Sequence, residues 1–363
     1  MAIDASLKAW LSLSLIRGLG GESARRLLKD FGSPEAVLSA SISSLKSVVK
    51  ADIAAEISKG VSDDAIAPTL AWLEDGNNHI VTLADGDYPQ ALLNIPDPPL
   101  LLYVKGRLDL LNRPALAIVG SRSATPQGIK NAEAFAKSLS DTGLCIISGM
   151  AHGIDTAAHS GALRGPGSSI AVVGTGLDKV YPAANRDLAH ALAQQGALIS
   201  EFPLGTPPLA ANFPRRNRLI SGMSIGCLVV EASLQSGSLI TARLALEQGR
   251  DVFAIPGSIH APQSKGCHAL LKQGAKLVET AQDILEELGN PLATPMRNTA
   301  AQAADTQEPG FVLLGHLGFD PVDIDTLGVR CGLTIAELSA MLLSLELEGR
   351  ICTLPGGLYQ RIQ

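Results

Sequence analysis

The chain has 363 residues, 46% of them apolar and 18% charged, which suits two or three packed domains and excludes a disordered protein. Its net charge of −6, from 29 basic and 35 acidic residues, excludes bulk positive charge as a means of binding nucleic acid, so such a site must be a local basic patch. It has no apolar run of about 20 residues, no signal-like leader and no CxxC pair among its five cysteines, so we expect a reduced protein of the cytoplasm that does not enter a membrane.

Residues 1–83 form the first predicted domain, in which apolar residues recur at helical spacing in stretches such as LKAWLSLSLI and SPEAVLSA. Gly18 and Gly20 separate two short predicted helices in a helix-hairpin-helix pattern. Such a hairpin can present backbone N–H groups to a nucleic-acid phosphate, while the alternative is a helix pair that only packs. The cations around this turn are Arg17, Arg25, Arg26 and Lys29.

Residues 84–287 form the second predicted domain, in which short β-branched runs alternate with helical stretches. The runs are ALAIVGSR, LCIISGMAHG, SIAVVGTGLD, ALISEFPLG, GCLVVEAS and DVFAIPGS. Strands that are apolar throughout and alternate with amphipathic helices predict a parallel sheet covered on both faces. The expected fold class is therefore α/β, with a Rossmann-type, doubly wound parallel sheet.

A segment rich in Ala, Thr, Gln, Asn and Pro, residues 288–309, is the predicted linker to a third domain at 310–363. Two predicted helices flank Cys331-Gly332-Leu333, and Thr334 with Glu337 forms a capping box at the start of the second helix. Two strands around a Pro-Gly-Gly turn complete a winged-helix pattern. Five acidic residues against two arginines between 323 and 350 argue against a DNA-reading role for this domain.

Four predicted strands of the second domain end in turns of small residues. The turns are Gly120-Ser121-Arg122, Ser148-Gly149, Gly174-Thr175-Gly176 and Ser236-Gly237-Ser238. Ligands of an open parallel sheet bind beyond the carboxyl ends of its strands. Glycine lets the backbone approach an anion, and the helix N-terminus that follows offers N–H donors. Together these turns predict one convergent anion-binding site.

The stretch FPRRNRLISG, residues 213–222, adds Arg215, Arg216 and Arg218, while residues 205–225 contain no acid. Arginine suits phosphate, because its rigid fork of N–H donors matches two oxygens at once. Phe213 directly before these cations suits a nucleic-acid strand, whose bases stack on aromatic rings. The alternative interpretation places Phe213 in the core.

Other kinds of site have weaker support in the sequence. There is no GxxxxGK[ST], and GTGLDK lacks the third glycine of GxGxxG, which disfavours a nucleotide cofactor. His152, Asp155 and His159 have the spacing of one helix face, but no further ligand cluster accompanies them. We therefore expect no metal, with Asp155 capping the helix and His159 making a buried polar contact. Glu201 and Glu231 are expected to pair with the arginines.

Taken in order, a series of motifs closely resembles the DNA-processing protein A family, DprA/Smf. The motifs are VGSR (119–122), SGMAHGIDTAAH (148–159), GTGLDKVYPAAN (174–185), SEFP (200–203), FPRRNRLISGMS (213–224), VVEAS (229–233), SGSLITA (236–242) and GRDVFAIPG (249–257). The resemblance covers the whole predicted Rossmann-type domain. The flanking segments resemble, more loosely, the SAM-like helix-hairpin-helix and winged-helix domains of the long three-domain form of that family.

The resemblance implies a protein that binds single-stranded DNA without cutting it and loads the RecA recombinase onto it in natural transformation. It also implies displacement of single-strand-binding protein and a homodimer formed through the Rossmann-type domain. Carried over by position, phosphates would be held by Ser121, Arg122, Ser148 and Gly149, with Gly174 and Gly176 lining the same pocket. A base would stack on Phe213, the basic rim would comprise Arg215, Arg216, Asn217 and Arg218, and a helix N-terminus would be offered by Gly237 and Ser238.

An enzyme is the alternative class of function, since the cytokinin-activating phosphoribohydrolases have a similar Rossmann-type domain. Their PGGxGTxxE motif is missing from the second domain, where the corresponding helix begins SGSLITA, and the only Pro-Gly-Gly lies between the C-terminal strands. We therefore expect no catalytic residues and no cofactor.

Overall fold

The computed structural model describes residues 5–289, 313, 316–317, 322–347, 351–354 and 357–361. The chain divides into two compact units, Met1–Thr294 and Pro295–Gln363. The predicted helical and Rossmann-type domains therefore fall within one unit. From residue 290 onward, the predicted linker 288–309 lies outside the described residues.

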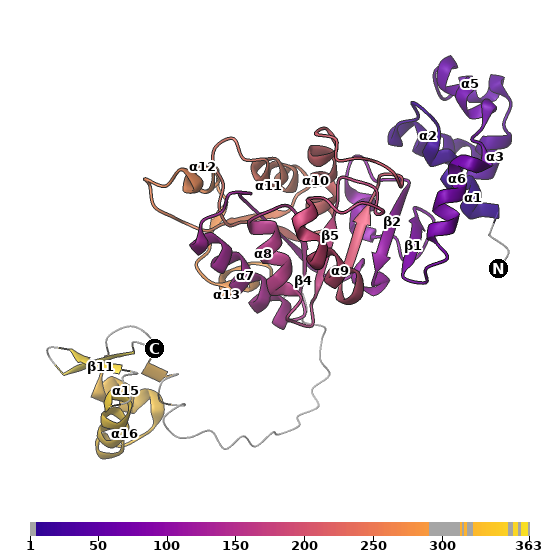
Figure 1. Ribbon diagram of the computed structural model, residues 1–363. Helices are drawn as coiled ribbons and strands as arrows, with labels where there is room; N and C mark the ends of the chain where they lie inside the picture. The colour runs from indigo at the N-terminus through magenta and orange to yellow at the C-terminus, as the bar shows by residue number, and fades with distance from the viewer. Residues whose placement is uncertain are drawn as a thin grey trace. The chain divides into compact units, whose positions relative to one another are not determined.

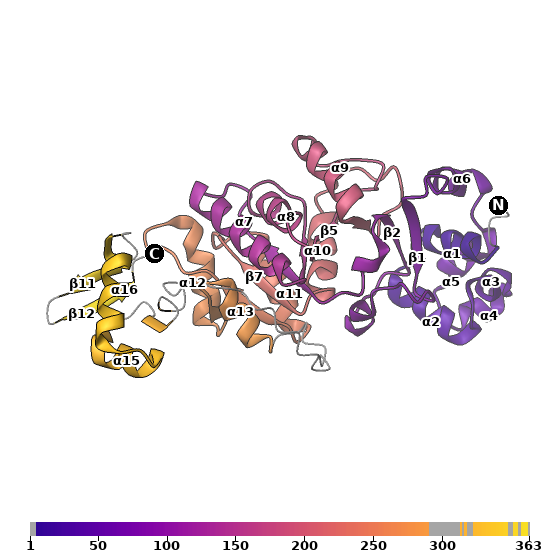
Figure 2. The same ribbon diagram turned by 90° about the horizontal axis from the view of Figure 1, so that it is seen from below.

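Six short helices form the N-terminal part of the first unit (Figure 2). They are α1 (Ala5–Leu15), α2 (Gly21–Phe31), α3 (Pro34–Ser39), α4 (Ile42–Lys46), α5 (Ala51–Lys59) and α6 (Asp63–Trp72). Between α1 and α2, Gly18 has a φ of 80°, a left-handed conformation that glycine adopts without strain. The predicted pair of helices around a glycine turn is thereby confirmed.

A nine-stranded sheet forms the rest of the first unit together with its covering helices (Figure 1). Its strands are β1 (Asn78–Thr82), β2 (Leu101–Gly106), β3 (Ala115–Val119), β4 (Cys145–Ser148), β5 (Ser169–Val172), β6 (Ala197–Ser200), β7 (Gly226–Val229), β8 (Asp251–Ala254) and β9 (Lys276–Leu277). Their order is β1-β2-β6-β5-β4-β3-β7-β8-β9. The pairs β1–β2 and β2–β6 are antiparallel, and all the others are parallel. The predicted parallel sheet is confirmed, but its antiparallel edge strand β1 starts before the predicted boundary at residue 83.

Helices cover both faces of this sheet, which explains why its strands are apolar throughout. One face packs against α7 (Pro126–Asp141), α8 (Ile154–Ala162), α9 (Arg186–Gln195) and α13 (Ala281–Glu287), and the other against α10 (Asn212–Gly222), α11 (Ser238–Glu247) and α12 (Lys265–Lys272). Alternate residues of each strand serve opposite faces: in β3, Leu116 packs on the α7 side and Ala117 on the α11 side.

The helical part packs against the β1–β2 edge of the sheet through an apolar contact and a charged one. Trp10 and Leu11 pack against Tyr103 of β2. Nearby, Arg25 of α2 donates to Oδ1 of Asp97 at 2.9 Å and to the carbonyl oxygens of Pro98 at 2.7 Å and Pro96 at 3.1 Å. One of the cations noted around the predicted hairpin is therefore engaged within the protein.

Replacing Arg25 by alanine is expected to destabilise the helical part by about 1–2 kcal/mol, because three hydrogen bonds to the loop before β2 are lost. Arg26→Ala is the matched control, because Arg26 is the next residue in the chain and its side chain is exposed. Urea unfolding followed by tryptophan fluorescence measures the effect, since both tryptophans of the chain, Trp10 and Trp72, lie in this part. Equal midpoints for the two variants would contradict the prediction.

The elements of the second unit that the structure describes with their bounds are a small sheet and two helices. They are β10 (Val322–Asp323), α15 (Ile324–Cys331), α16 (Ile335–Leu347), β11 (Ile351–Leu354) and β12 (Leu358–Arg361), with strand order β10-β12-β11. At the start of α16 the backbone N–H of Thr334 donates to Glu337 at 2.9 Å and the N–H of Glu337 donates back to the Thr334 hydroxyl at 3.4 Å. The predicted capping box and winged-helix arrangement are thus confirmed.

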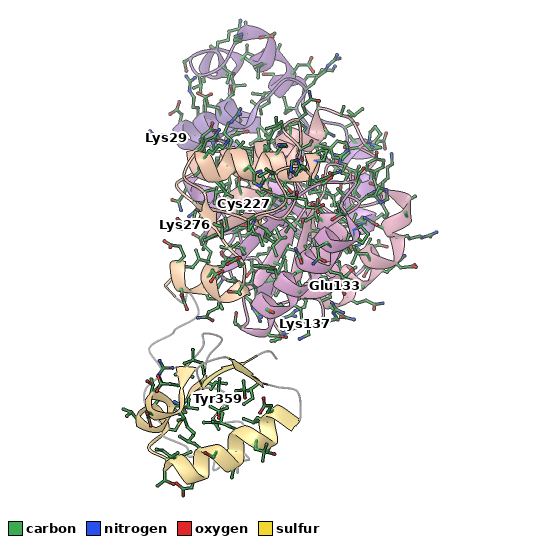
Figure 3. All side chains as sticks on the ribbon, turned by 90° about the vertical axis from the view of Figure 1, so that its left-hand side faces the viewer. Lys29, Glu133, Lys137, Cys227, Lys276 and Tyr359 are labelled. Atoms are coloured by element: carbon green, nitrogen blue, oxygen red, sulfur yellow. The ribbon has the colours of Figure 1, made fainter. Side chains whose placement is uncertain are left out.

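Three cysteines of the first unit, Cys145, Cys227 and Cys267, are buried free thiols. Figure 3 shows Cys227 inside the fold, whereas the lysines labelled there, such as Lys29 and Lys137, lie toward the outside. Burial raises the pKa of the Cys145 and Cys227 thiols to about 12, so neither is poised to react as a thiolate. Within the described part of the chain, no helix has the length and apolar character needed to cross a bilayer.

Candidate functional site

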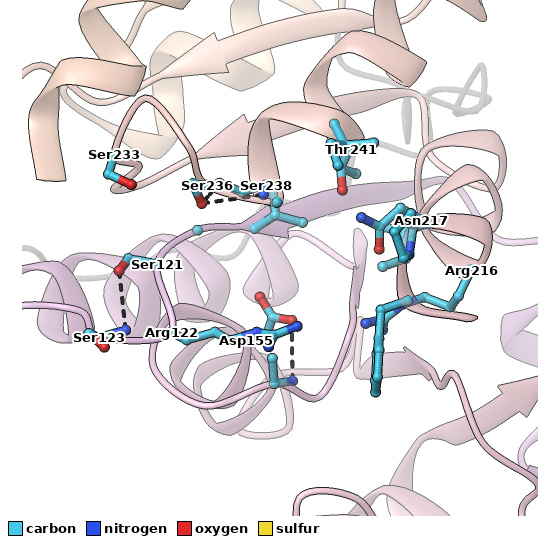
Figure 4. A pocket seen from close by; sticks show the side chains of 18 of the residues that line it. Ser121, Arg122, Ser123, Asp155, Arg216, Asn217, Ser233, Ser236, Ser238 and Thr241 are labelled. Atoms are coloured by element: carbon cyan, nitrogen blue, oxygen red, sulfur yellow. Dashed lines mark hydrogen bonds between the residues drawn. The ribbon is translucent and has the colours of Figure 1, made fainter. Parts of the chain in front are cut away.

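A cavity of about 750 Å³ opens at the carboxyl ends of β3 and β7. These neighbouring strands are followed by helices on opposite faces of the sheet, α7 and α11, so the cavity lies at the topological switch point. Its walls come from the loops after β3 and β7 and from α10 and α11 (Figure 4). Its only charged lining residues among those the structure describes are Arg122, Asp155 and Arg216.

The loop after β3 brings Ser121 and Arg122 to the cavity. The Arg122 side chain is exposed, and its guanidinium carbon lies 5.7 Å from the ring centroid of Phe213, a cation–π arrangement. In the described part of the chain it makes no hydrogen bond or ion pair, so its fork of N–H donors remains available to an anion.

One face of α10 lines the cavity with Phe213, Arg216, Asn217 and Ile220, which are spaced at i, i+3, i+4 and i+7. The Phe213 ring forms an aromatic pair with Tyr181, at a centroid distance of 5.6 Å and an interplanar angle of 42°. A Cβ at Gly174 would approach the Phe213 ring to 3.2 Å, so the small residue at the end of β5 leaves room for the ring. The result is an aromatic platform, Tyr181 and Phe213, beside Arg122.

Arg216 lies beneath this platform and is only 4% exposed. Its Nη1 donates to the carbonyl oxygen of Gly149, the residue after β4, at 2.7 Å and to that of Val172, the last residue of β5. A Cβ at Gly149 would collide with both this guanidinium and the Asp155 carboxylate, so the two charged groups converge there. Burial lowers the pKa of Arg216 to about 10, while the nearby Asp155 carboxylate opposes that shift.

Asp155, at the start of α8, is the buried acid that faces Arg216. Its Oδ2 accepts hydrogen bonds from the backbone N–H groups of Gly149 and Ala151, each at 3.2 Å. Burial raises the pKa of Asp155, and the Arg216 charge counteracts this effect. Asp155 therefore organises the loop before α8. The expected capping role is wrong, because Gly153 is the N-cap of α8 and no side chain caps the helix there.

The fourth wall is the N-terminal turn of α11, where Ser236, Gly237, Ser238 and Thr241 line the cavity. The hydroxyls of Ser236 and Ser238 lie 2.6 Å apart and hydrogen-bond each other. The structure thus brings together Ser121, Arg122, Phe213, Arg216, Asn217, Gly237 and Ser238 from the predicted set.

The expectation that Arg215, Arg216 and Arg218 form one basic cluster is wrong. Arg215 and Arg218 lie on another face of α10 and donate to Oε2 of Glu201 at 2.9 and 2.7 Å. Arg218 also lies 3.4 Å from Asp97, at the junction with the helical part. Because Glu201 is 3% exposed and needs compensation for its buried charge, these two arginines serve the protein interior rather than the cavity rim.

Four predicted small residues, Ser148, Gly149, Gly174 and Gly176, also lie outside the cavity lining, and Gly174 packs behind the Phe213 ring. Ser148 is buried, and its hydroxyl donates to the carbonyl oxygen of Ile118 at 2.6 Å, which ties β4 to β3. Gly149 lies under the cavity against Arg216, and Gly176 packs against the Pro203–Leu204 loop. The predicted residues of the turns after β4 and β5 therefore do not line the cavity, whereas those after β3 and before α11 do.

His159 and Glu231 each have a hydrogen-bond partner within the protein. Nδ1 of His159 lies 2.7 Å from the Ser169 hydroxyl, and burial lowers the pKa of this histidine to about 3. No cluster of three metal-ligating side chains exists among the described residues. Glu231 does not pair with an arginine as expected; it accepts from the N–H and hydroxyl of Thr125, the residue before α7, at 2.9 and 2.5 Å.

Tyr181 and Thr241 are cavity residues that the sequence analysis did not select. Tyr181 lies in an irregular loop, where no periodicity assigns a direction to its ring. The spacing of Thr241 does carry a signal, because it follows Ser238 by three residues on one helix face.

The chain matches known proteins along most of its length. The family model described as DNA recombination-mediator protein A matches residues 79–289, and the DprA winged helix domain matches residues 297–357. Protein Smf of Escherichia coli (strain K12) is 46% identical over 305 residues, which cover 82% of this chain and 81% of that protein.

Two solved structures of similar proteins share the fold. DNA processing protein A (DprA) of Streptococcus pneumoniae has a TM-score of 0.68 at 38% identity, with 79% of this chain and 99% of that chain covered. DNA processing protein A of Helicobacter pylori, whose structure concerns its single-stranded DNA binding mode, has a TM-score of 0.53 at 32% identity and covers 58% of this chain and 95% of its own. This chain therefore belongs to the DNA recombination-mediator protein A family, DprA/Smf.

Proposed function

We propose that this chain binds single-stranded DNA in the cavity between β3 and β7. The observation that carries the proposal is the exposed, unpaired Arg122 beside the aromatic platform of Tyr181 and Phe213. A nucleic-acid strand offers the two complementary groups, a phosphate for the guanidinium and a base for a ring. The single-stranded DNA binding mode of the Helicobacter pylori relative supports the same ligand.

Within this proposal the phosphate contacts come from Arg122, the Ser121 loop and the N-terminus of α11 at Gly237 and Ser238. Arg216 acts indirectly, because its donors already hold the ends of β4 and β5. Arg215 and Arg218 contribute through Glu201, by fixing α10. These contacts carry no base information, so binding by this half of the cavity is independent of sequence.

A binding role is favoured over hydrolysis by the state of the carboxylates around the cavity. Asp155 accepts two backbone hydrogen bonds, and Glu231 is held by Thr125. Neither is a free base within reach of a bound nucleotide. We therefore infer a recombination mediator that acts without catalysis. Release of free base from a nucleoside monophosphate would instead identify a phosphoribohydrolase.

The family resemblance extends this proposal to partners. We infer that the chain acts in the cytoplasm during natural transformation, protects incoming single strands and loads the RecA recombinase onto them. Displacement of single-strand-binding protein and a homodimer through the Rossmann-type domain belong to the same proposal. Mass measurement in solution and strand exchange with RecA on coated DNA test these two points.

Arg122→Ala is expected to weaken binding of a labelled oligothymidylate at least tenfold, since a hydrogen-bonded charge contact to phosphate is lost. Fluorescence anisotropy over a salt series should also show the slope of log K against log salt falling in magnitude by about 0.7. Arg113→Ala is the control, because Arg113 pairs with Asp109 at 2.7 Å just before the opposite end of β3. Equal binding by wild type and Arg122→Ala would place the strand elsewhere.

A further inference from the structure

The second unit carries a row of exposed residues along α16, the helix that follows the turn at Gly332 (Figure 2). Ile335, Ser339 and Leu343 are spaced four residues apart, so they lie in line over about 12 Å of the helix surface. Ile335 is 56% and Leu343 59% exposed, and the Ser339 hydroxyl between them already donates to the Ile335 carbonyl oxygen at 2.8 Å. We call this largely apolar row the α16 stripe.

Exposed apolar residues are concentrated in this unit. Val329 on the neighbouring α15 is 87% exposed, so the two helices together contain three large aliphatic side chains that are more than half exposed. In the much longer first unit, the described residues include four of this kind, which are Leu209, Leu234, Ile259 and Leu277. Isolated apolar residues on a surface need no explanation, but their concentration on two adjacent helices indicates an interaction surface.

The charges around the α16 stripe are mainly negative. Residues 322–347 contain four acids and one arginine, and α16 itself contains no lysine or arginine. Glu337 in its first turn accepts from the N–H and the hydroxyl of Thr334 at 2.9 and 2.6 Å. Glu346 in its last turn accepts from the N–H and the hydroxyl of Thr353 at 3.2 and 2.8 Å. These hydrogen bonds hold one carboxylate near each end of the helix.

This charge distribution decides what the α16 stripe can contact. In a DNA-reading helix-turn-helix the second helix lies in the major groove, where the phosphates call for cations that α16 lacks. A second copy of the same surface would bring like charges together, which is unfavourable. A protein segment whose apolar side chains are flanked by lysine or arginine complements both the stripe and the carboxylates beside it.

We propose that the α16 stripe is a docking surface for a protein partner whose contacting segment is apolar and basic. The winged helix then recruits a protein and does not read DNA. This role is separate from the cavity between β3 and β7, so it does not depend on the binding of a single strand there.

The test uses the full chain and a fluorescein-labelled synthetic helical peptide with leucine on one face and lysine on the other. A second peptide with glutamate in place of lysine examines the charge requirement. The variants of the stripe are Leu343→Ser and Ile335→Ser. Ile42→Ser is the matched control, because Ile42 is an apolar residue that is 45% exposed on α4 of the first unit. Fluorescence anisotropy gives the affinities.

Leu343→Ser is expected to weaken binding of the leucine–lysine peptide about five- to 20-fold, because the leucine side chain is no longer buried in the complex. Ile335→Ser should have a similar effect, so a folding defect in one variant does not decide the outcome, and Ile42→Ser should bind like wild type. Glu346→Gln keeps an oxygen for Thr353 but removes the charge. It should weaken binding about two- to fivefold at low salt and have little effect at about 1 M salt.

Equal binding by wild type and the stripe variants, no binding by wild type, or equal binding of the lysine and glutamate peptides would overturn the inference. Loss of duplex DNA binding in Leu343→Ser would make α16 a DNA-reading helix instead. A smaller mass of Leu343→Ser in solution would make the stripe an interface between copies of the chain, which also overturns the inference. Oligothymidylate binding should be the same for wild type and Leu343→Ser, and its absence in wild type would contradict the proposed function alone.

Discussion

Replacing Arg216 by methionine is expected to lower the free energy of unfolding of the first unit by about 3–5 kcal/mol, because a buried charge loses its partner. The substitution removes the donors to the carbonyl oxygens of Gly149 and Val172 and leaves Asp155 buried without a cation. Denaturant unfolding followed by circular dichroism measures the loss. Arg215→Met is the control, since that side chain is 56% exposed and Glu201 keeps its hydrogen bond from Arg218 at 2.7 Å.

The same variant should respond to pH in a defined direction. Burial raises the pKa of Asp155, and Arg216 counteracts the rise, so removing Arg216 raises that pKa further. A carboxyl whose folded pKa lies above its unfolded value costs stability as the pH rises from the unfolded value through the folded one. The deficit of Arg216→Met relative to wild type should therefore shrink as the pH is lowered through that range. A deficit that is independent of pH would show that Arg216 does not lower the pKa of Asp155.

Truncating Phe213 to alanine is expected to weaken single-strand binding by about 1–3 kcal/mol, or roughly 5- to 150-fold, because the ring offers a stacking surface to a base. Tyr181→Ala should have an effect in the same range, since the more exposed Tyr181 ring forms the other half of the platform. The two rings touch, so the double variant should lose less than the sum of the single losses. Anisotropy with an oligothymidylate gives the three affinities.

Tyr181→Phe serves as the control, because it keeps the ring and removes only the hydroxyl. Its affinity should stay close to that of wild type. Normal binding by Phe213→Ala would return Phe213 to a purely structural role next to Gly174, and strictly additive losses would show that the rings bind separately.

Much of the fold was predictable from the chain because its information is local. Apolar runs such as ALAIVGSR predict a buried strand. Ligands of an open parallel sheet bind beyond the carboxyl ends of its strands, and this rule predicted where the cavity lies. The capping box at Thr334 was predictable for the same reason, since its two members are three residues apart. The antiparallel edge strand β1 was not, because its pairing with β2 is a contact across the long connection of residues 83–100.

The partners of charged residues were harder to predict, because they depend on contacts between distant segments. Glu231 accepts a hydrogen bond from Thr125, which lies 106 positions away in the sequence, and no local pattern around either residue predicts this contact. The error over the arginines was avoidable, however. Arg215 and Arg218 are three residues apart, whereas Arg216 shares its helix face with Phe213 and Ile220, so a helical projection of FPRRNRLISG separates the two sets.

The two faces of α10 limit which insertions and deletions this helix can tolerate. This helix of eleven residues carries cavity residues on one face and the partners of Glu201 on another. Each residue turns an α-helix by about 100°. One residue inserted or deleted after Phe213 would therefore rotate Arg216 away from the carbonyl oxygens of Gly149 and Val172 and bring a different side chain to Glu201. Point substitutions on α10 act locally, but its helical phase admits no single-residue insertion or deletion, and functional variants of this protein should keep the spacing from Phe213 to Arg218 unchanged.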